Sequence, residues 1–424
     1  MKRLATILLF AALTTMVQAQ TVEYIDDEEC GCELFFVDGI QTTRDGDLHG
    51  FRLADGTVIV ENKYKYVDQF HGQYCKVYLD EGMCGLIDRT GREIIPCIYS
   101  DINYPSSGRI LVIKDYRTGY CDMDGRQVIE PQYWQGADFH NGIAVVAVYD
   151  SFAPYCLFID TLGAPLFGTT YENAKPMIEG HALVRRNGLW GIIDSTGREV
   201  LPAQYPYMTD NSNGHFFAGY DTGLAMFDYS MQPLTPFVYT WTEGYYEGFT
   251  PVYRDGGYGF LDAHGREAIP CIYDQVGAVR EGRVMVRRGD HYGIVDTTGR
   301  IVLPIEYDNS LPGGTKYTYY DSRALVEKDG KLGFVDLDGK LVIPFYFERA
   351  YHFTQGLAAV RHQGLWGYID TNGDVYLPFV FEFVSPFRWG RAEVVYNGNT
   401  SKVDLKGRCV KNCKGIIAWR DIEK

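Results

Sequence analysis

The feature that most constrains this chain is a tandem repeat. The stretch Leu189–Tyr205, LWGIIDSTGREVLPAQY, recurs with substitutions through most of the sequence, and seven of the ten intervals between successive copies are 34 residues long. A fixed period of this length is the signature of a repeat array, in which neighbouring units share one continuous core. The copies align on one turn position, occupied by Gly56, Gly91, Gly125, Gly163, Gly197, Met231, Gly265, Gly299, Gly339, Gly373 and Gly407.

Positions within a copy are numbered here from that turn residue. Position −3 is aspartate in ten of the eleven copies, with Leu53 as the exception, and position −6 is glycine in the clearer copies. Position +8 is aromatic in the first ten copies, and a proline recurs at +5. These four positions carry the structural prediction that follows.

Each copy predicts a β-hairpin. In the copy of Gly197, residues 191–194 form one strand, Asp194–Gly197 a tight turn, and 198–202 a second, antiparallel strand. An aspartate at the first turn position can accept a hydrogen bond from the backbone two residues on, and glycine tolerates the positive φ of a bulged hairpin. Proline at +5 has no N–H for a ladder, so we expect it to end the second strand or to mark the edge of the sheet.

A third strand lies between hairpins, where residues 142–145, 180–184, 282–286 and 356–360 alternate small and apolar side chains. Three strands a copy and no helical periodicity predict an all-β fold, an array of roughly 34-residue repeats. We expect the +8 aromatics to form the continuous core. A propeller blade usually takes ~40–45 residues and propellers have ~4–8 blades, so the sequence favours an open, solenoid-like array over one or two closed propellers.

The N-terminus predicts export. Lys2 and Arg3 precede an apolar run to about Leu13 and a small-residue cleavage site ending at Ala19, so residues 1–19 are expected to be a signal peptide. The run is shorter than the ~20 residues that span a bilayer. We therefore expect a periplasmic or extracellular protein, or one attached peripherally to the outer surface, without an integral membrane segment. Residues 20–47 and 409–424 are predicted caps, flanking an array of about eleven units over 48–408.

The charge of the chain argues against nucleic acid as a partner. Forty Lys and Arg against 55 Asp and Glu give −15, and removal of Lys2 and Arg3 with the signal makes this 38 − 55, or −17. A polyanion needs a basic face to bind.

Ten cysteines in an exported chain allow disulfides. Cys75 with Cys84, and Cys409 with Cys413, are the candidate pairs. Cys97 and Cys271 follow the +5 proline, where other copies carry Ala203 or Ile305, which predicts free thiols in the core.

Nothing in the repeat indicates catalysis. The D-S-T-G of Asp194–Gly197 differs by one residue from the D-[ST]-G turn of aspartic proteases, and the loop starting at Asp370 lacks the later glycine and acid of an EF-hand. Loose calcium binding at such turns is the alternative to simple turn chemistry. We predict no catalytic residues, no metal site and no cofactor.

Aromatics away from the +8 position are the candidate binding residues. The longest insertion, Asn309–Asp321, is the favoured functional loop because insertions in repeat proteins gather on one face, often the binding face. Exposed Tyr and Trp suit protein hot spots or sugar stacking. The candidates are Tyr317, Tyr319, Tyr320, Trp134, Trp241 and Trp389.

The repeat resembles the WG-repeat (KWG repeat) family of bacterial tandem-repeat proteins. Leu189-Trp190-Gly191 and Leu365-Trp366-Gly367, each followed by I-D-x-x-G and a proline, carry the resemblance, and Tyr258-Gly259 or Cys84-Gly85 replace the literal pair elsewhere. The resemblance implies an exported or surface-associated β-repeat protein and no catalytic residues.

These observations predict a non-enzymatic exported repeat protein whose extended surface binds a protein or a cell-envelope component. The alternative is a carbohydrate-binding or carbohydrate-active envelope protein, in which a polysaccharide meets acidic and aromatic side chains. An enzyme of that class needs two carboxylates ~5–9.5 Å apart across a groove.

Overall fold

The structure is a computed structural model that describes residues 7–8, 21–27 and 32–411, apart from 81, 150–153, 210–213 and 309–316. Side chains are described from 38 to 410, apart from residue 80 and the same gaps. Most of the predicted signal segment, Cys30 and residues 412–424 thus lie outside the described residues. The chain divides into two compact units, Met1–Pro206 and Tyr207–Lys424.

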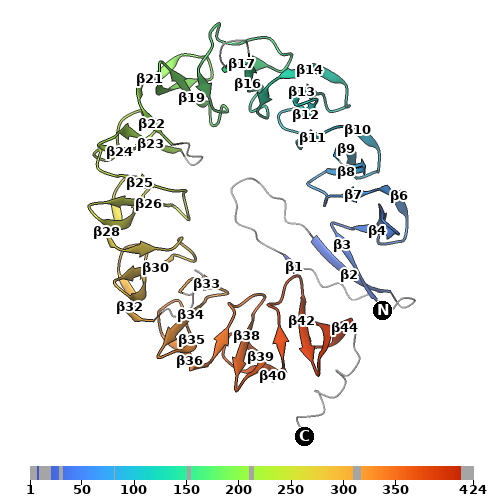
Figure 1. Cartoon of the computed structure of the whole chain (residues 1–424), viewed down its shortest axis with the longest axis vertical. Helices are drawn as coiled ribbons and strands as arrows, with labels where there is room; N and C mark the ends of the chain where they lie inside the picture. Colours follow the sequence, from blue (N-terminus) through green and yellow to red (C-terminus); the bar gives the residue numbers. More distant parts are fainter. Residues whose placement is uncertain are drawn as a thin grey trace. The chain divides into compact units, whose positions relative to one another are not determined.

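Unit 1 is built of small antiparallel sheets that follow one another in chain order (Figure 1). A six-stranded sheet, which includes much of the predicted N-terminal cap, precedes sheets of four, four, three and four strands. The strands are β1 (Ile7–Leu8), β2 (Thr21–Asp27), β3 (Cys32–Val37), β4 (Ile40–Asp45), β5 (Leu48–Leu53) and β6 (Val58–Tyr64); β7 (Tyr66–Val67), β8 (Tyr74–Asp80), β9 (Met83–Asp88) and β10 (Glu93–Tyr99); β11 (Asp101–Ile102), β12 (Ile110–Lys114), β13 (Arg117–Cys121) and β14 (Gln127–Tyr133); β15 (Gln135–Gly136), β16 (Ile143–Tyr149) and β17 (Pro154–Asp160); and β18 (Asn173–Ala174), β19 (His181–Arg186), β20 (Leu189–Asp194) and β21 (Glu199–Tyr205).

Unit 2 repeats the same plan, with a three-stranded sheet followed by five sheets of four strands. Its strands are β22 (Tyr207–Met208), β23 (His215–Tyr220) and β24 (Gly223–Asp228); β25 (Trp241–Thr242), β26 (Phe249–Arg254), β27 (Gly257–Asp262) and β28 (Glu267–Tyr273); β29 (Gln275–Val276), β30 (Arg283–Arg288), β31 (His291–Asp296) and β32 (Ile301–Tyr307); β33 (Tyr319–Tyr320), β34 (Arg323–Lys328), β35 (Lys331–Val335) and β36 (Leu341–Phe347); β37 (Arg349–Ala350), β38 (Leu357–His362), β39 (Leu365–Asp370) and β40 (Val375–Phe381); and β41 (Phe383–Val384), β42 (Arg391–Tyr396), β43 (Asn399–Asp404) and β44 (Cys409–Lys411).

The predicted all-β tandem array is confirmed, and no sheet among the described residues closes into a barrel. The prediction of three strands a copy is wrong for most sheets, which have a fourth strand of two residues such as β18 or β25. This strand was missed because two residues are too few to show an alternating pattern. Within each of the two units, the sheets follow one another as the repeats of an open, solenoid-like array do.

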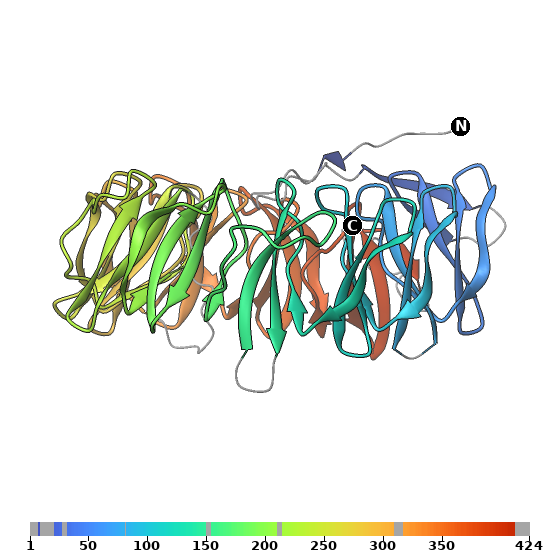
Figure 2. The same ribbon diagram turned by 90° about the horizontal axis from the view of Figure 1, so that it is seen from above.

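Each sheet has two ends, which are visible in Figure 2 as the places where the long strands are connected. We call the end that carries the D-x-x-G turn the turn end, and the opposite end, where the second and third strands of a sheet meet, the hairpin end. In the sheet β18–β21 these are Asp194–Gly197 and Asn187–Gly188, respectively.

The D-x-x-G turn forms as predicted. The Oδ1 atom of Asp194 accepts hydrogen bonds from the backbone N–H of Thr196 at 2.9 Å and of Arg198 at 3.1 Å, and the N–H of Gly197 bonds to the Asp194 carbonyl at 2.9 Å. Gly197 has φ +83°, the left-handed conformation that follows a type I turn in a bulged hairpin. In the copy that has Leu53 in place of aspartate, the same backbone bonds close the turn, and the Asp55 carboxylate accepts the N–H of Thr57 at 2.9 Å.

The +5 proline does not end its strand. β21 continues past Pro202 to Tyr205, and the pairing with β20 shifts between Ile192↔Leu201 and Trp190↔Tyr205. The proline is therefore accommodated in a bulge, and the sheet order places β21 at the edge. The edge prediction is correct, because a residue without an N–H leaves a free sheet edge unpaired.

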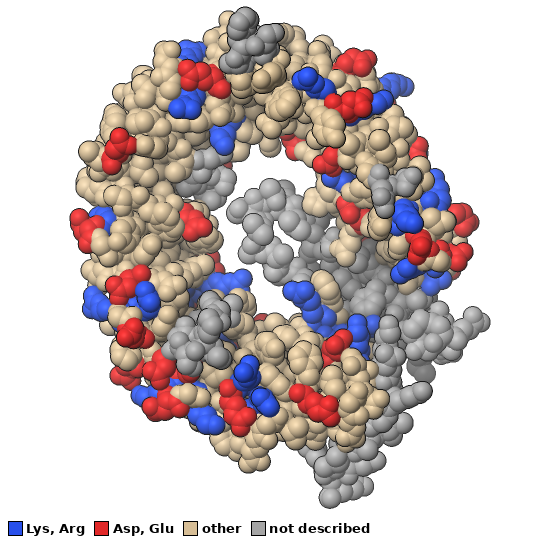
Figure 3. Space-filling view, in the orientation of Figure 1, with Lys and Arg blue, Asp and Glu red and all other residues tan. Residues whose placement is uncertain are grey.

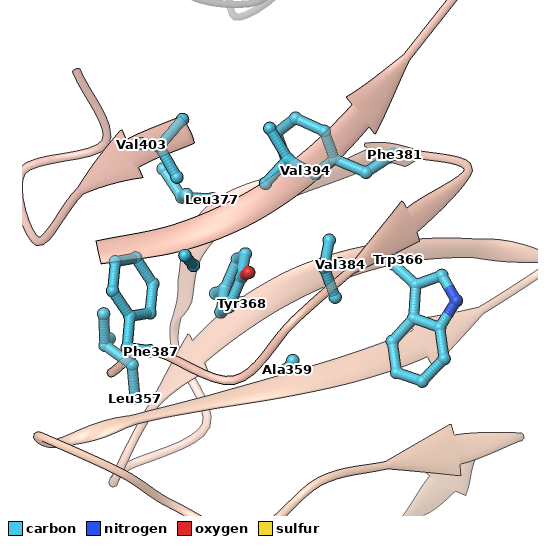
Figure 4. Close-up of a cluster of buried hydrophobic side chains, with 11 residues drawn as sticks. Leu357, Ala359, Trp366, Tyr368, Leu377, Phe381, Val384, Phe387, Val394 and Val403 are labelled. Carbon is cyan, nitrogen blue, oxygen red and sulfur yellow. The ribbon is translucent and has the colours of Figure 1, made fainter. Parts of the chain in front are cut away.

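The core confirms the +8 prediction. Eight of the ten +8 aromatics are buried and the other two, Tyr133 and Tyr307, are partly buried. Figure 4 shows one such cluster, in which Phe381 at +8 lies among Trp366, Leu377 and Val394. A second buried apolar position, +14, was not predicted; it is occupied by Phe70, Phe139, Met177, Val279, Tyr319, Phe353 and Phe387. Positions after the insertion in the copy of Gly299 are counted without its six extra residues, so that Tyr319 is +14.

A ladder of hydrogen bonds ties neighbouring sheets at the turn end. The Glu247 carboxylate accepts the backbone N–H groups of Glu281 and Gly282, one copy later, both at 3.0 Å. Asp321 accepts the N–H of Gly356 at 2.8 Å in the same way. The ladder residues share position +16 and a positive φ near 50°. Each such contact satisfies backbone donors in the next sheet and fixes the spacing of the repeats.

The candidate disulfide between Cys75 and Cys84 is not formed, since both thiols are free and buried. Cys75 pairs with Ile87 and Cys84 with Tyr78, which places the two side chains on opposite faces of their sheet, in different core clusters. Cys97 and Cys271 are free, as predicted. Cys409 is disulfide-bonded, and its predicted partner Cys413 lies outside the described residues.

Candidate functional site

Two of the six predicted binding residues are core residues. Tyr317 and Tyr319 are each only 1% exposed, so their prediction as surface contacts is wrong. The inserted residues are those before Tyr317, within 309–316 and outside the described residues, whereas Tyr317 and Tyr319 occupy the ordinary positions +12 and +14. Their hydroxyls donate to the backbone carbonyls of Asp308 and, at 2.8 Å, of Asp336.

Tyr320 packs between neighbouring sheets. The Cζ atom of the Arg280 guanidinium lies 4.4 Å from the centroid of the Tyr320 ring, and the centroid of the His352 ring lies 4.5 Å from it. Burial, with the nearby charge of Arg280, lowers the pKa of His352 to about 4. The imidazole is therefore neutral at pH 7, which suits a stacking role beside a cation. We interpret this stack as a link between three successive sheets of unit 2.

Trp389 is the most exposed of the predicted tryptophans, at 60%. It occupies position +16, where other copies carry a polar ladder residue, and it has φ +51°. A bulky side chain in the left-handed region is uncommon. Its ring is 5.5 Å from the Arg388 guanidinium.

Trp134 belongs to an exposed aromatic group at the hairpin end of unit 1. Its ring centroid lies 5.5 Å from the ring centroid of Tyr149 and 5.8 Å from the Cζ atom of the Arg117 guanidinium. Trp134 is 49% exposed, Tyr149 58%, and Tyr116, at the tip of the β12–β13 hairpin, 90%. We call Tyr116, Arg117, Trp134 and Tyr149 the hairpin cluster; they come from two successive sheets.

The backbone fixes Trp134 in place. Its N–H donates to the carbonyl of Ala147 in β16 at 2.9 Å, so the residue is already anchored to the sheet that carries Tyr149. Tyr116 and Tyr149 were missed by the sequence analysis. The signal for Tyr116 was available, because hairpin tips in other copies carry Asn-Gly or Asp-Gly where this one has Asp115-Tyr116.

Trp241 lies at the hairpin end of unit 2. It is directly opposite Tyr253 across β25 and β26, and its ring meets Tyr258 edge to face at 5.5 Å. Tyr253 and Tyr258 are in turn 4.7 Å apart. The indole is 38% exposed. The three aromatic rings therefore form one continuous row across the sheet, and the indole of Trp241 at its end remains open to solvent.

The aspartates of the D-x-x-G turns are bound within the turns. Hydrogen bonds, first from the Thr196 hydroxyl and then from the backbone, lower the pKa of Asp194 to about 2 although burial opposes the shift. The Nε–H of Arg198 donates to the other carboxylate oxygen at 3.1 Å. Within the described part of the chain, no three His, Cys, Asp or Glu side chains are grouped closely enough to hold a metal ion.

The surface charges are mixed. On the face in Figure 3, Lys and Arg side chains are interspersed with Asp and Glu around both units. Among the described residues, there is no helix long and apolar enough to cross a membrane.

A family model for the WG-containing repeat matches eight tandem segments: 85–117, 119–150, 158–190, 190–220, 258–290, 292–331, 333–366 and 366–399. The chain belongs to the WG-containing repeat family. The resemblance expected from Trp190-Gly191 is therefore confirmed. The stretch between 220 and 258, which contains the copy with Met231 in place of the turn glycine, is not among the matched segments.

Similar solved structures share little sequence with this WG-repeat chain. A eukaryotic initiation factor is 10% identical over 64% of this chain and 87% of its own, with a TM-score of 0.38. The extracellular domain of a putative hybrid two-component system from B. thetaiotaomicron is 10% identical over 92% and 70%, with a TM-score of 0.26. That of a putative one-component system from the same organism is 11% identical over 97% and 67%, with a TM-score of 0.24. No curated protein matches the sequence.

Proposed function

We propose that this WG-repeat protein is exported, is not an enzyme, and binds a protein or another cell-envelope component through the hairpin cluster of unit 1. The observation that carries the proposal is the composition of the cluster. Tyr, Trp and Arg are the residue types enriched at the energetic centres of protein interfaces. Here the exposed rings of Trp134 and Tyr149 lie beside each other, the partly buried Arg117 lies next to Trp134, and Tyr116, which precedes Arg117, is 90% exposed.

The energetics support a binding role. An aromatic side chain buries ~150–250 Å², so covering the exposed halves of Trp134 and Tyr149 would remove on the order of 200 Å² from water. At roughly 25 cal/mol per Å² this is worth about 5 kcal/mol before the costs of association. The backbone hydrogen bond from Trp134 to Ala147 and the contacts of the indole with Tyr149 and Arg117 lower the ordering cost, because they already position the residue.

The export and non-enzymatic parts rest on other residues. Lys2, Arg3 and the apolar run that follows support a signal segment. The turn carboxylates, which are the most regular acids of the repeat, are bound to turn amides and arginines, as in Asp194 and Asp262. A carboxylate held in that way is a weak general base because its pKa is low.

The test is site-specific photo-crosslinking on the full chain in cells. A photoreactive phenylalanine analogue replaces Tyr149, and crosslinked species from the envelope fraction are identified. We expect one or a few defined adducts, and we expect Trp134→Ala and Arg117→Ala, introduced in the same chain, to reduce each adduct at least tenfold.

The matched control is the same analogue at Trp389, an exposed tryptophan at the turn end of unit 2. Adducts common to both positions are non-specific. The proposal fails if Tyr149 yields no adduct beyond those of Trp389, or if Trp134→Ala leaves the Tyr149 adducts unchanged in a protein whose thermal midpoint is that of the wild type.

A further inference from the structure

We propose that unit 2 has a second binding surface, for a neutral polysaccharide, at the hairpin end of the sheets β22–β24 and β25–β28. We call Tyr207, Asp221, Trp241 and Asp255 the polysaccharide shelf. This surface differs from the hairpin cluster in location and in chemistry, and it does not depend on the function proposed above.

The shelf consists of the same two-residue arrangement repeated in successive sheets. Tyr207 and Trp241 both occupy position +10, the first residue of the two-residue strand, and they are 52% and 38% exposed. Asp221 and Asp255 both lie at hairpin tips, directly after Tyr220 and Arg254, whose partners are Gly223 and Gly257. Figure 1 shows β22 and β25 in two successive sheets of unit 2.

Each aromatic ring is held by its own sheet. Tyr258 meets the indole of Trp241 edge to face, at an interplanar angle of 83°, which leaves the outer part of the indole open. A hydrogen bond with the Asp221 carboxylate, aided by its charge, raises the pKa of Tyr207. The aromatic and the carboxylate of the first sheet therefore act as one unit, with the ring held beside the acid.

This pairing matches the chemistry of a sugar. An aromatic face packs against the C–H groups of a pyranose ring, and a carboxylate accepts hydrogen bonds from hydroxyl groups, which are stronger than those between neutral groups. Stacked sheets are ~10 Å apart, so the shelf offers the same contact twice at a fixed interval. A ligand with repeating units can use both contacts at once, which favours a polymer over a monosaccharide.

The charges favour a neutral polymer. Asp221, Asp255, Glu243 and Asp274 are all exposed on these sheets or beside them. The Arg254 side chain already donates to Glu267 and Asp255, at 2.6 Å in both cases. An acidic polysaccharide would meet the carboxylates of Asp221, Glu243 and Asp274, and like charges oppose association.

A peptide suits the shelf less well. Peptides that add to a sheet edge are bound by main-chain hydrogen bonds along an unpaired strand. The edge strands here, β22 and β25, are two residues long. They offer little backbone for such pairing.

The experiment is affinity electrophoresis of the full chain in native gels that contain one soluble polysaccharide each. The neutral polymers are hydroxyethyl cellulose, laminarin, dextran and galactomannan, and the acidic ones are alginate and polygalacturonate. We expect retardation by at least one neutral polymer and by neither acidic one. Trp241→Ala and Tyr207→Ala should each weaken that retardation at least tenfold, and Asp255→Asn should weaken it several-fold.

Trp389→Ala is the matched control, because it removes an exposed tryptophan at the other end of a sheet in the same unit, and it should leave the retardation unchanged. Tyr207→Ala carries the test if Trp241→Ala lowers the thermal midpoint, since Tyr207 is half exposed. The proposal is overturned if no neutral polymer retards the protein, if acidic polymers retard it more strongly, or if both shelf variants behave as wild type. Trp134→Ala should not alter the retardation, which separates this result from the crosslinking test of the hairpin cluster.

Discussion

The carbonyl oxygen of Leu201 lies 2.6 Å from the place where Gly191 would carry a Cβ atom. The bulge around Pro202 pushes the edge strand against the backbone of the neighbouring strand, and only a residue without a side chain fits beneath it. The same contact recurs at 2.3–2.7 Å at Gly50, Gly85, Gly119, Gly259, Gly293, Gly333 and Gly367. The contact also occurs at Gly50 and Gly119, which have Glu61 and Glu130 in place of the proline eleven residues later. The glycine of the WG pair is therefore required by the bulged path of the edge strand, with or without the proline.

Gly191→Ala should accordingly destabilise unit 1. The clash is with backbone, which cannot move aside as a flexible side chain could, so we expect a loss of at least about 2 kcal/mol in the free energy of unfolding. Urea unfolding followed by tryptophan fluorescence measures it. Gly277→Ala is the matched control: its φ is not positive and its nearest neighbour, the Met285 Cβ, is 3.4 Å away, an ordinary contact. Equal effects of both variants would refute the interpretation.

The turn carboxylates predict a pH dependence at Asp296. Burial would raise the pKa of this group, but hydrogen bonds from Thr298 and Arg300 outweigh it and lower the pKa from 3.8 to about 2. A pKa lowered by folding stabilises the folded state above about pH 4, and the contribution is lost as the pH falls toward 2. Asp296→Asn should remove on the order of 1–2 kcal/mol at pH 7 and much less at pH 2. Asp290→Asn, at an exposed hairpin tip, is the control, and parallel pH profiles for wild type and Asp296→Asn would contradict the prediction.

The turn-end ladder predicts local coupling between sheets. In Glu247→Ala the backbone N–H groups of Glu281 and Gly282 lose their acceptor, so their amide hydrogens should exchange at least tenfold faster. Glu247→Gln keeps an acceptor oxygen and should show an intermediate effect. Hydrogen exchange resolved by mass spectrometry of the segment 277–285 gives the measurement. Unchanged exchange in the alanine variant would show that the ladder contributes nothing to stability.

Burial predicts unreactive thiols in the folded protein. It raises the pKa of Cys75 to about 12, and those of Cys84 and Cys271 to about 11. The reactive thiolate is therefore scarce at pH 8. A chromogenic disulfide reagent at that pH should titrate these three cysteines only after denaturation. Peptide mapping of the labelled sites identifies them, and rapid native labelling of Cys75 or Cys84 would be inconsistent with the structure.

The sequence predicts the repeat, the D-x-x-G turn and the +8 core because each depends on interactions within one copy. Asp194 and Gly197 close their turn with local hydrogen bonds, and periodicity reveals such positions directly. The missed features depend on neighbouring strands or sheets. The +14 core position is filled by residue types as different as Met177 and Phe139, and its burial comes from the adjacent sheet.

The binding candidates were harder to predict for the same reason. An aromatic in a loop-like segment can face the core or the solvent, and nothing local distinguishes Tyr319 from Trp241. Tyr319 is buried because it occupies a core position of the repeat immediately after an insertion that hides the register. The hairpin cluster joins residues from two sheets, Arg117 and Trp134, whose proximity follows from how the copies stack.

Trp389 offers a test of whether a strained residue is kept for a contact. It has the left-handed φ of a ladder position, which costs an ordinary L-residue roughly 1–2 kcal/mol, and Asn adopts this conformation more readily. Trp389→Asn should therefore raise the thermal midpoint, by the equivalent of about 0.5–1 kcal/mol after the loss of the contact with Arg388. Trp389→Ala keeps the backbone strain and should not be stabilising. Differential scanning calorimetry of the two variants decides the matter: a destabilised Trp389→Asn protein would mean that the exposed indole is held chiefly by its packing within the sheet.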